Sequence, residues 1–216
     1  SKENLLVITT GPLTGSGAPS SSRFNISTLS PQTGYLTSSN CGGNFGYYLK
    51  KAGLDGLILT GQCEKPTWIE IQNDTVKFHD ASGLWGMKTS KTQEMLDDAL
   101  RLGNGRVRKN GKICIGPAGE NQVLYSCIVS NERVFGRGGT GWMNLKAVCA
   151  SGNKEVPIYD KERMVKHTQK WFRYLRKHPL TGSQLPKLGT AGLVSAMQMK
   201  HILSTKNYTY GQYEDF

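Results

Sequence analysis

Three short segments combine small or hydroxyl-bearing residues with arginine or glycine, as anionic ligands require. In residues 20–25, three serines precede Arg23, whose guanidinium can donate two parallel hydrogen bonds to one phosphate. In residues 40–44, Gly42 and Gly43 let the backbone approach a ligand, and the helix start that follows offers free N–H groups. The alternative interpretations are a solvated arginine in an ordinary loop and a plain tight turn.

The third segment, residues 133–141, places Arg133 and Arg137 around a glycine-rich turn. Its glycines formally satisfy G-x-G-x-x-G, but a dinucleotide fingerprint needs a strand running directly into the glycines and a full helix after them. Here residues 131–132 interrupt the approach, and the next strand follows too soon for a helix. We therefore predict a phosphate-bearing ligand other than a dinucleotide, with a solvated surface turn as the alternative.

Residues for acid–base, nucleophilic or metal chemistry are few. No histidine has a serine or cysteine nucleophile in motif context, and neither paired carboxylates nor a metal-ligand cluster stands out. The odd number of cysteines and the absence of C-x-x-C indicate buried, reduced thiols in a cytosolic protein. Cys41 is the exception, because it lies inside a glycine-rich turn. The five cysteines are Cys41, Cys63, Cys114, Cys127 and Cys149.

The elements that position these segments change in character near Pro157. Before it, apolar patterns predict two short helices, at 45–52 and from a capping box of Ser90 and Gln93 to about 103. After it, Asp160 can cap a helix that stops at Pro179, and a second helical stretch covers 191–202. Strands are predicted at 4–10, 24–29, 57–60, 67–72, 76–79, 113–115, 123–129 and 147–150. The fold class is therefore α+β over residues 1–156, followed by the beginning of an all-α domain over 157–216.

A weak internal repeat is visible within the first part. Residues 7–12 parallel residues 112–117, since each segment is an apolar strand ending at Gly-Pro. A glycine-rich loop, a Leu-Lys pair at 49–50 or 145–146, and a strand closing on glycine follow in each case. Two copies of one unit predict an internally duplicated β-sheet domain with short helices and two equivalent loops.

The formal net charge of +11 divides almost equally, with +5 on residues 1–158 and +6 on residues 159–216. Such an excess attracts nucleic acid, a membrane surface or a phosphorylated cofactor. No nucleic-acid motif accompanies it and no apolar run is long enough to span a membrane, so we expect neither partner. The basic second part reads as a solvated helix face, and a non-catalytic basic binding module is an alternative function for the whole.

The motifs, taken together and in order, resemble the tungsten-dependent aldehyde:ferredoxin oxidoreductase family. The match covers nearly the whole chain and extends into the helical part through Leu185 to Thr190. Within the first part it rests on the segments at 10–15, 18–19, 23–25, 30–34, 42–46, 49–53, 65–66, 84–86, 115–121 and 136–139.

The resemblance implies a fold and a set of cofactors. The family's first domain is a duplicated α+β unit beneath a tungsten (or molybdenum) ion chelated by two pterin dithiolenes. Magnesium bridges the pterin phosphates, and a [4Fe–4S] cluster lies beside one pterin. Arg23 matches the arginine between pterin and cluster, and Asn40 and Val134 match positions whose backbone carbonyls hold magnesium. The residues matching the lining of the pterins and their phosphates are Gly42, Gly43, Arg133, Gly136, Arg137 and Gly138.

The implied activity is oxidation of an aldehyde to a carboxylate, with electrons passing through the cluster to ferredoxin or another electron carrier. The resemblance also implies a cytoplasmic protein and allows a homodimer. Family members that reduce aromatic thioesters or oxidise phosphorylated sugars are the alternatives. The cluster cysteines and the acid–base residues lie downstream in the family, so we expect no catalytic residue in this piece and no turnover by it alone. In addition, residues 141–146 are shorter than the family pattern.

Overall fold

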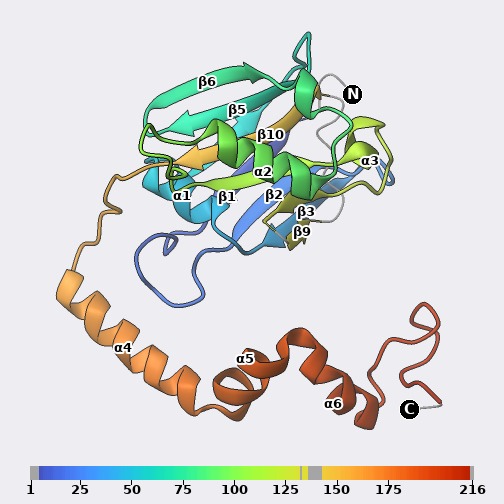
Figure 1. The fold of residues 1–216 in the computed structure, drawn as a ribbon. Coiled ribbons are helices and arrows are strands. Elements are labelled where there is room, and N and C mark those ends of the chain that lie inside the picture. The colour runs from blue at the N-terminus through green and yellow to red at the C-terminus, as the bar shows by residue number, and fades with distance from the viewer. Residues whose placement is uncertain (1–4, 132, 136–142, 215–216) are drawn as a thin grey trace. The chain divides into compact units, whose positions relative to one another are not determined.

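The computed structural model describes residues 5–131, 133–135 and 143–214 of the 216-residue chain. Contacts between Cα atoms divide the chain into two compact units, Ser1–Tyr159 and Asp160–Phe216. Figure 1 shows the fold, with strands and short helices in the first unit and helices in the second. The two units are described separately below.

The first sheet of unit 1 has four strands in the order β3-β2-β1-β4, and every neighbouring pair is antiparallel. Helix α1 (Phe45–Lys51) connects β3 to β4. Side chains alternate across this sheet, so Ile8, Phe24 and Cys41 point into the core while their neighbours point away from it. The four strands are β1 (Leu6–Thr10), β2 (Phe24–Leu29), β3 (Leu36–Cys41) and β4 (Gly56–Leu59).

The second sheet has six strands in the order β6-β5-β10-β7-β8-β9. The pair β10–β5 is parallel and the remaining pairs are antiparallel. Every residue of the central strand β10 is buried, and its residues are apolar or small except for Lys146. The strands are β5 (Thr67–Gln72), β6 (Thr75–Asp80), β7 (Gly111–Ile115), β8 (Ile128–Ser130), β9 (Arg133–Phe135) and β10 (Leu145–Ser151).

The order β3-β2-β1-β4 recurs in the second sheet as β9-β8-β7-β10, with the same antiparallel pairings. This confirms the internal duplication and the α+β fold class. The hairpin β5–β6 is the addition that makes the second sheet wider. One part of the sequence alignment of the repeats was wrong, because Leu49 and Lys50 lie in α1 whereas Leu145 and Lys146 begin β10.

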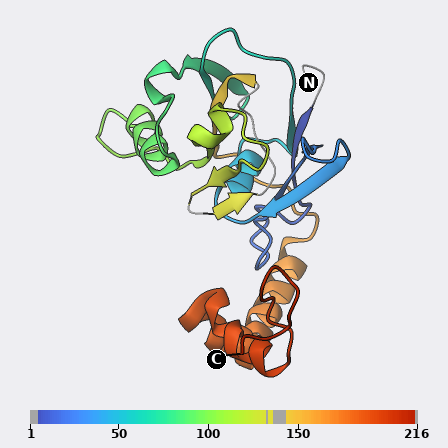
Figure 2. The same cartoon turned by 90° about the vertical axis from the view of Figure 1, so that its right-hand side faces the viewer.

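The first unit is layered, as Figures 1 and 2 show from two directions. The main core lies between the two sheets and includes α1, through Phe45, Leu49 and Ala52. A second core lies on the other face of the six-stranded sheet, where α2 (Thr89–Ala99) contributes Leu96. The short helices η1 (Ser82–Leu84) and α3 (Pro117–Glu120) complete this unit. The four-stranded sheet therefore keeps one face outside both cores.

Close backbone packing fixes α1 against the second sheet and accounts for two of the many glycines. A Cβ on Gly111 would lie 2.4 Å from the Cα of Phe45, and a Cβ on Gly152 would lie 2.3 Å from the amide nitrogen of Ala52. Only glycine fits at such distances, so both ends of α1 rest directly on the backbone of that sheet.

We expect Gly152→Ala to destabilise the first unit by about 1–3 kcal/mol, since the added methyl group forces backbone to move. The matched control is Gly83→Ala, because a Cβ on Gly83 would meet nothing within 4 Å. Urea denaturation of both variants provides the measurement. Equal stability of the two would contradict the packing described.

Two predicted elements differ from the structure. The expected strand at 123–129 is reduced to Ile128–Ser130, because turn hydrogen bonds such as Val123 N–H to Ala118 O precede it. The predicted capping box was wrong, since α2 begins at Thr89 and its N-cap is Lys88, with no side-chain cap. Gln93 instead donates to the backbone oxygens of Thr89 and Asn131. Strands β3 and β9 were not predicted.

The second unit contains α4 (Lys161–Lys177), a π-helical turn η3 (Leu180–Gln184), α5 (Leu185–Leu188), η4 (Gly189–Leu193) and α6 (Val194–Met199). The predicted cap of α4 is confirmed, since the Asp160 carboxylate accepts a hydrogen bond of 2.8 Å from the Arg163 amide. Among the described residues, no helix has the length and apolar character needed to cross a membrane.

Candidate functional site

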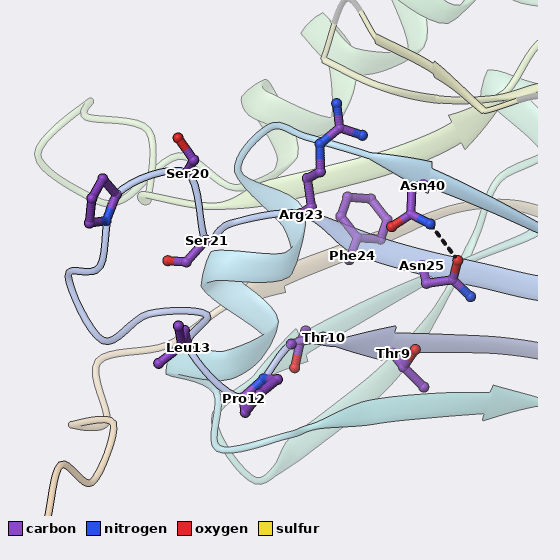
Figure 3. A pocket seen from close by; sticks show the side chains of 12 residues that line it. Thr9, Thr10, Pro12, Leu13, Ser20, Ser21, Arg23, Phe24, Asn25 and Asn40 are labelled. Atoms are coloured by element: carbon purple, nitrogen blue, oxygen red, sulfur yellow. Dashed lines mark hydrogen bonds between the residues drawn. The ribbon is translucent and has the colours of Figure 1, made fainter. Parts of the chain in front are cut away.

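A row of polar side chains crosses the face of the four-stranded sheet that lies outside the cores. Thr9 pairs with Asn25 across β1 and β2, and Asn25 pairs with Asn40 across β2 and β3. The Asn40 amide donates to Asn25 Oδ1 at 3.0 Å, and the Asn25 amide donates to Ser27 Oγ at 2.7 Å. Figure 3 shows the hydrogen bond between the two asparagines, with Arg23 directly before β2. This row therefore presents amide and hydroxyl groups to whatever covers the sheet.

An open pocket of about 430 Å³ lies at one end of this row. Arg23 is its only charged lining residue, and none of the described lining residues is a carboxylate. Such a lining favours an anionic ligand, because it offers one permanent cation and several neutral donors. The pocket is lined by Thr9, Thr10, Gly11, Pro12, Leu13, Pro19, Ser20, Ser21, Arg23, Phe24, Asn25 and Asn40.

The loop that forms one wall of the pocket is closed by the side chain of Thr14, which is fully buried. The Thr14 hydroxyl accepts a hydrogen bond from the Gly11 amide at 3.1 Å and donates one to the Ser21 carbonyl at 2.8 Å. Since Gly11 and Ser21 stand at opposite ends of the loop, this one hydroxyl holds both ends together. Thr14 is a positioning residue that sequence inspection had not singled out.

We expect Thr14→Val to loosen the loop, because valine keeps the shape but leaves two backbone groups without their partner, at a cost of about 1–3 kcal/mol. Hydrogen exchange of the amides in residues 11–22 should become faster. Thr14→Ser retains the hydroxyl and serves as the control. Unchanged exchange in Thr14→Val would show that the loop is held by other contacts.

A second arginine approaches the same end of the sheet from the other repeat. Strands β3 and β9 contact each other, and a Cβ on Gly42 would lie 3.4 Å from the Arg133 guanidinium. The next residue, Gly43, has a φ of +108°, which side chains rarely tolerate. The structure thus brings the glycine turn and Arg133 together, as the sequence predicted from two separate segments.

Beneath this turn lie two buried polar atoms that have no hydrogen-bond partner among the described residues, Ser130 Oγ and Asn131 Oδ1. They lie 3.4 Å and 3.3 Å from the position of a Cβ on Gly43. Buried polar atoms are costly when unpaired, so their grouping marks a place where a further polar partner belongs.

Both arginines lie close enough to Cys41 to act on its thiol. Burial raises the pKa of the Cys41 thiol, while the positive charges of Arg133 and Arg23 act to lower it. The net direction is upward, so Cys41 stays a neutral thiol packed beneath the site. Cys114, buried elsewhere in the unit, has a pKa raised to about 11 by the same desolvation.

All five cysteines are free thiols. The expectation that Cys41 is the exception among buried thiols was wrong, because Cys41 ends β3 and is buried. Cys41, Cys114 and Cys149 are buried, whereas Cys63 and Cys127 are half-buried. Within the part of the chain that the structure describes, no group of three or more His, Cys, Asp or Glu side chains could hold a metal ion. A metal held here would depend on other ligands.

Six of the nine predicted site residues are described. Five of these six lie at the end of β3, directly after it, or in β9. Arg23 precedes β2, and both it and Asn40 are exposed. Asn40 and Val134 occupy equivalent positions of the two repeats. Asn40 pairs with Asn25, which pairs with Thr9 on β1, and Val134 pairs with Val129, which pairs with Cys114 on β7. Thr9 and Cys114 each lie two residues before the Gly-Pro pair that ends their segment of the repeat. The remaining three, Gly136, Arg137 and Gly138, lie outside the described residues.

Sequence inspection missed Thr9 as well as Thr14, Ser130 and Asn131. Thr9 was detectable, because it occupies an outward position near the end of a strand that the sequence predicted. The other three depend on contacts between segments far apart in the chain, which no local pattern reports.

Comparison with known proteins agrees with this geometry. Residues 1–152 match the family described as "Aldehyde ferredoxin oxidoreductase, N-terminal domain". The chain belongs to this family of oxidoreductases. It is 41% identical over 217 residues to the tungsten-containing aldehyde ferredoxin oxidoreductase of Thermococcus kodakarensis and 40% identical over 218 residues to that of Pyrococcus furiosus. These alignments cover 98% and 99% of the chain but only 35% of each relative.

A solved structure has the same fold. The active site complex BamBC of benzoyl coenzyme A reductase, with 1,5-dienoyl-CoA bound, superposes with a TM-score of 0.78 at 32% identity. The match covers 93% of this chain and 30% of that one. The chain therefore spans about a third of the length of the proteins it matches, and the aldehyde ferredoxin oxidoreductases among them are named as tungsten-containing.

Proposed function

We propose that the first unit binds the pterin part of a tungsten cofactor, in a full-length protein that oxidises an aldehyde to a carboxylate. The observation that carries this proposal is the convergence of Arg23 and Arg133 on the Gly42–Gly43 turn, beside a pocket whose described lining has no carboxylate. Pterin cofactors carry phosphates, and a phosphate held in protein needs arginine and backbone N–H donors.

The residues present fit this group. Gly42 and Gly43 leave room for close approach, the row of Thr9, Asn25 and Asn40 offers amides and hydroxyls to a polar heterocycle, and buried Ser130 Oγ and Asn131 Oδ1 await a partner. The bound group would supply two-electron redox chemistry. The chain's own part is to hold and orient that group through Arg23 and Arg133 and to exclude water beneath it through the buried Phe24 and Cys41.

Gly136, Arg137 and Gly138 are proposed to give the second repeat the same role, because residue order places them after β9 as Gly42 and Gly43 follow β3. Asn40 and Val134 are proposed to hold magnesium through their carbonyl oxygens. Their equivalent positions in the two repeats support this, since an ion shared by two equivalent phosphates needs equivalent ligands.

The proposed overall reaction converts an aldehyde and water into a carboxylate, three protons and two electrons. A [4Fe–4S] cluster held by other parts of the full-length protein would supply the path for these electrons to ferredoxin, and we assign the protein to the cytoplasm. The names of the relatives support ferredoxin as acceptor. The aldehyde:ferredoxin activity is thus assigned to the whole protein and not to these 216 residues.

Reduction of an aromatic thioester is a second candidate function, favoured by the likeness to the benzoyl coenzyme A reductase complex. The higher identity to aldehyde ferredoxin oxidoreductases makes it the less favoured of the two.

The proposal is tested by purifying the full-length protein without oxygen and supplying acetaldehyde or benzaldehyde with oxidised benzyl viologen, and, in a separate assay, benzoyl-CoA with a reduced electron donor. Aldehyde-dependent reduction of benzyl viologen is expected. Turnover with benzoyl-CoA and none with either aldehyde would transfer the assignment to the second candidate.

A further inference from the structure

One face of α4 carries five cations in a continuous stripe. Arg163, Lys166, Lys170, Arg173 and Lys177 follow one another at alternating intervals of three and four residues. At 3.6 residues per turn this spacing confines them to an arc of about 80°. They therefore form a straight basic line along the helix, defined here as the basic stripe.

Within the described part of the chain, the basic stripe has acidic neighbours only at its start, Asp160 and Glu162. All five side chains belong to exposed residues, and none takes part in an ion pair there. The sequence contains no aspartate or glutamate between Glu162 and Glu214 that could neutralise these charges. Like charges at these spacings repel by about 0.2–0.5 kcal/mol per pair, so the stripe weakens the helix that carries it.

The opposite face of α4 is apolar, and its partly covered members are Met164, Thr168 and Leu175. Trp171 and Phe172 on the same side are 50% and 41% exposed, so this face has apolar area left to bury. Further packing of α4 would use that face first, because burying five unpaired cations costs several kcal/mol for each charge. The basic stripe consequently stays in contact with water.

We propose that the basic stripe of α4 is the docking surface for an acidic electron-carrier protein, the acceptor named under Proposed function, on which this inference rests. Charge complementarity favours a folded protein with clustered carboxylates. Single-stranded nucleic acid binds on grooves with interleaved aromatic rings, whereas Trp171 and Phe172 point away from the stripe. A membrane surface would need the apolar face free, and part of that face is already covered.

Such a stripe acts mainly on the association rate. A line of uncompensated charge steers an oppositely charged partner, raises the rate of encounter at low salt and loses this effect as salt screens it. We expect removal of three of the five cations to lower the second-order rate of ferredoxin reduction about tenfold at low ionic strength. The difference should disappear at high salt.

The test uses full-length protein with three lysines replaced, K166Q/K170Q/K177Q, because glutamine retains helix propensity. The matched control is K65Q/K77Q/K109Q, which removes the same charge from exposed lysines of the first unit. Each protein is assayed with an aldehyde and either a purified acidic ferredoxin or benzyl viologen. Binding of duplex DNA and of phosphatidylserine vesicles is measured in parallel.

The proposal expects K166Q/K170Q/K177Q to slow the ferredoxin reaction alone, with the viologen rate unchanged and the control variant near wild type. Equal ferredoxin rates in both variants would overturn it, as would a stripe-dependent affinity for DNA or vesicles without an effect on ferredoxin. Absence of viologen reduction in the wild type would instead refute the proposed aldehyde oxidation.

Discussion

Replacing Lys146 by methionine is expected to destabilise the first unit by about 3–5 kcal/mol. Lys146 and Glu120 form an ion pair whose side chains are 0% and 3% exposed. The Lys146 ammonium also donates to the Met87 carbonyl at 3.0 Å, and the Glu120 carboxylate accepts from the Gly86 amide at 2.8 Å. Removing the lysine leaves a buried carboxylate without its counter-charge, which explains the magnitude.

The double variant Lys146→Met/Glu120→Leu separates the two contributions to that cost. Replacing both charges by apolar groups removes the unpaired carboxylate, so most of the lost stability should return. Urea denaturation of wild type, both single variants and the double variant gives the coupling directly. If the double variant were as unstable as the sum of the single ones, the pair would not be the source of the effect.

Replacing Arg23 or Arg133 by alanine is expected to weaken cofactor retention about 10- to 100-fold in the full-length protein. This corresponds to the loss of charge-assisted hydrogen bonds, each contributing about 1.5–3 kcal/mol. Both arginines lie near Cys41 and neither forms an ion pair within the described residues, so no such pair is lost with them. The measurement is the pterin that remains bound after extensive dialysis.

The control for this experiment is Arg106→Ala, which removes an exposed arginine from a turn outside the pocket. It should retain pterin like the wild type and fold equally well. Retention by Arg23→Ala and Arg133→Ala at the level of Arg106→Ala would show that these guanidinium groups do not hold the phosphates.

Much of the fold was predictable because local patterns determine it. An apolar run ending at Gly-Pro identified β1, alternation identified β2, and the Asp160 cap identified the start of α4. Strand β3 was missed because its sequence, Leu-Thr-Ser-Ser-Asn-Cys, is mostly polar on both faces, with one apolar residue at each end. Its place in the sheet comes from pairing with β2, a tertiary effect.

The site was predictable where chemistry is local and not where it depends on packing. The serines before Arg23, the pair Gly42-Gly43 and the glycine-rich turn that follows Arg133 indicated these site residues from the local sequence alone. The meeting of Arg133 with the Gly42–Gly43 turn joins residues far apart in sequence and follows from the contact of β3 with β9. The Lys146–Glu120 pair was missed for the same reason, because its two residues lie in different segments and their local sequence does not indicate that they are buried.

The central claim is that this duplicated platform carries a metal–pterin cofactor, and metal analysis of active full-length protein tests it most directly. Elemental mass spectrometry of material that oxidises aldehydes should find tungsten, or molybdenum in its place, at close to one atom per chain. Active material that contains neither metal would contradict the account.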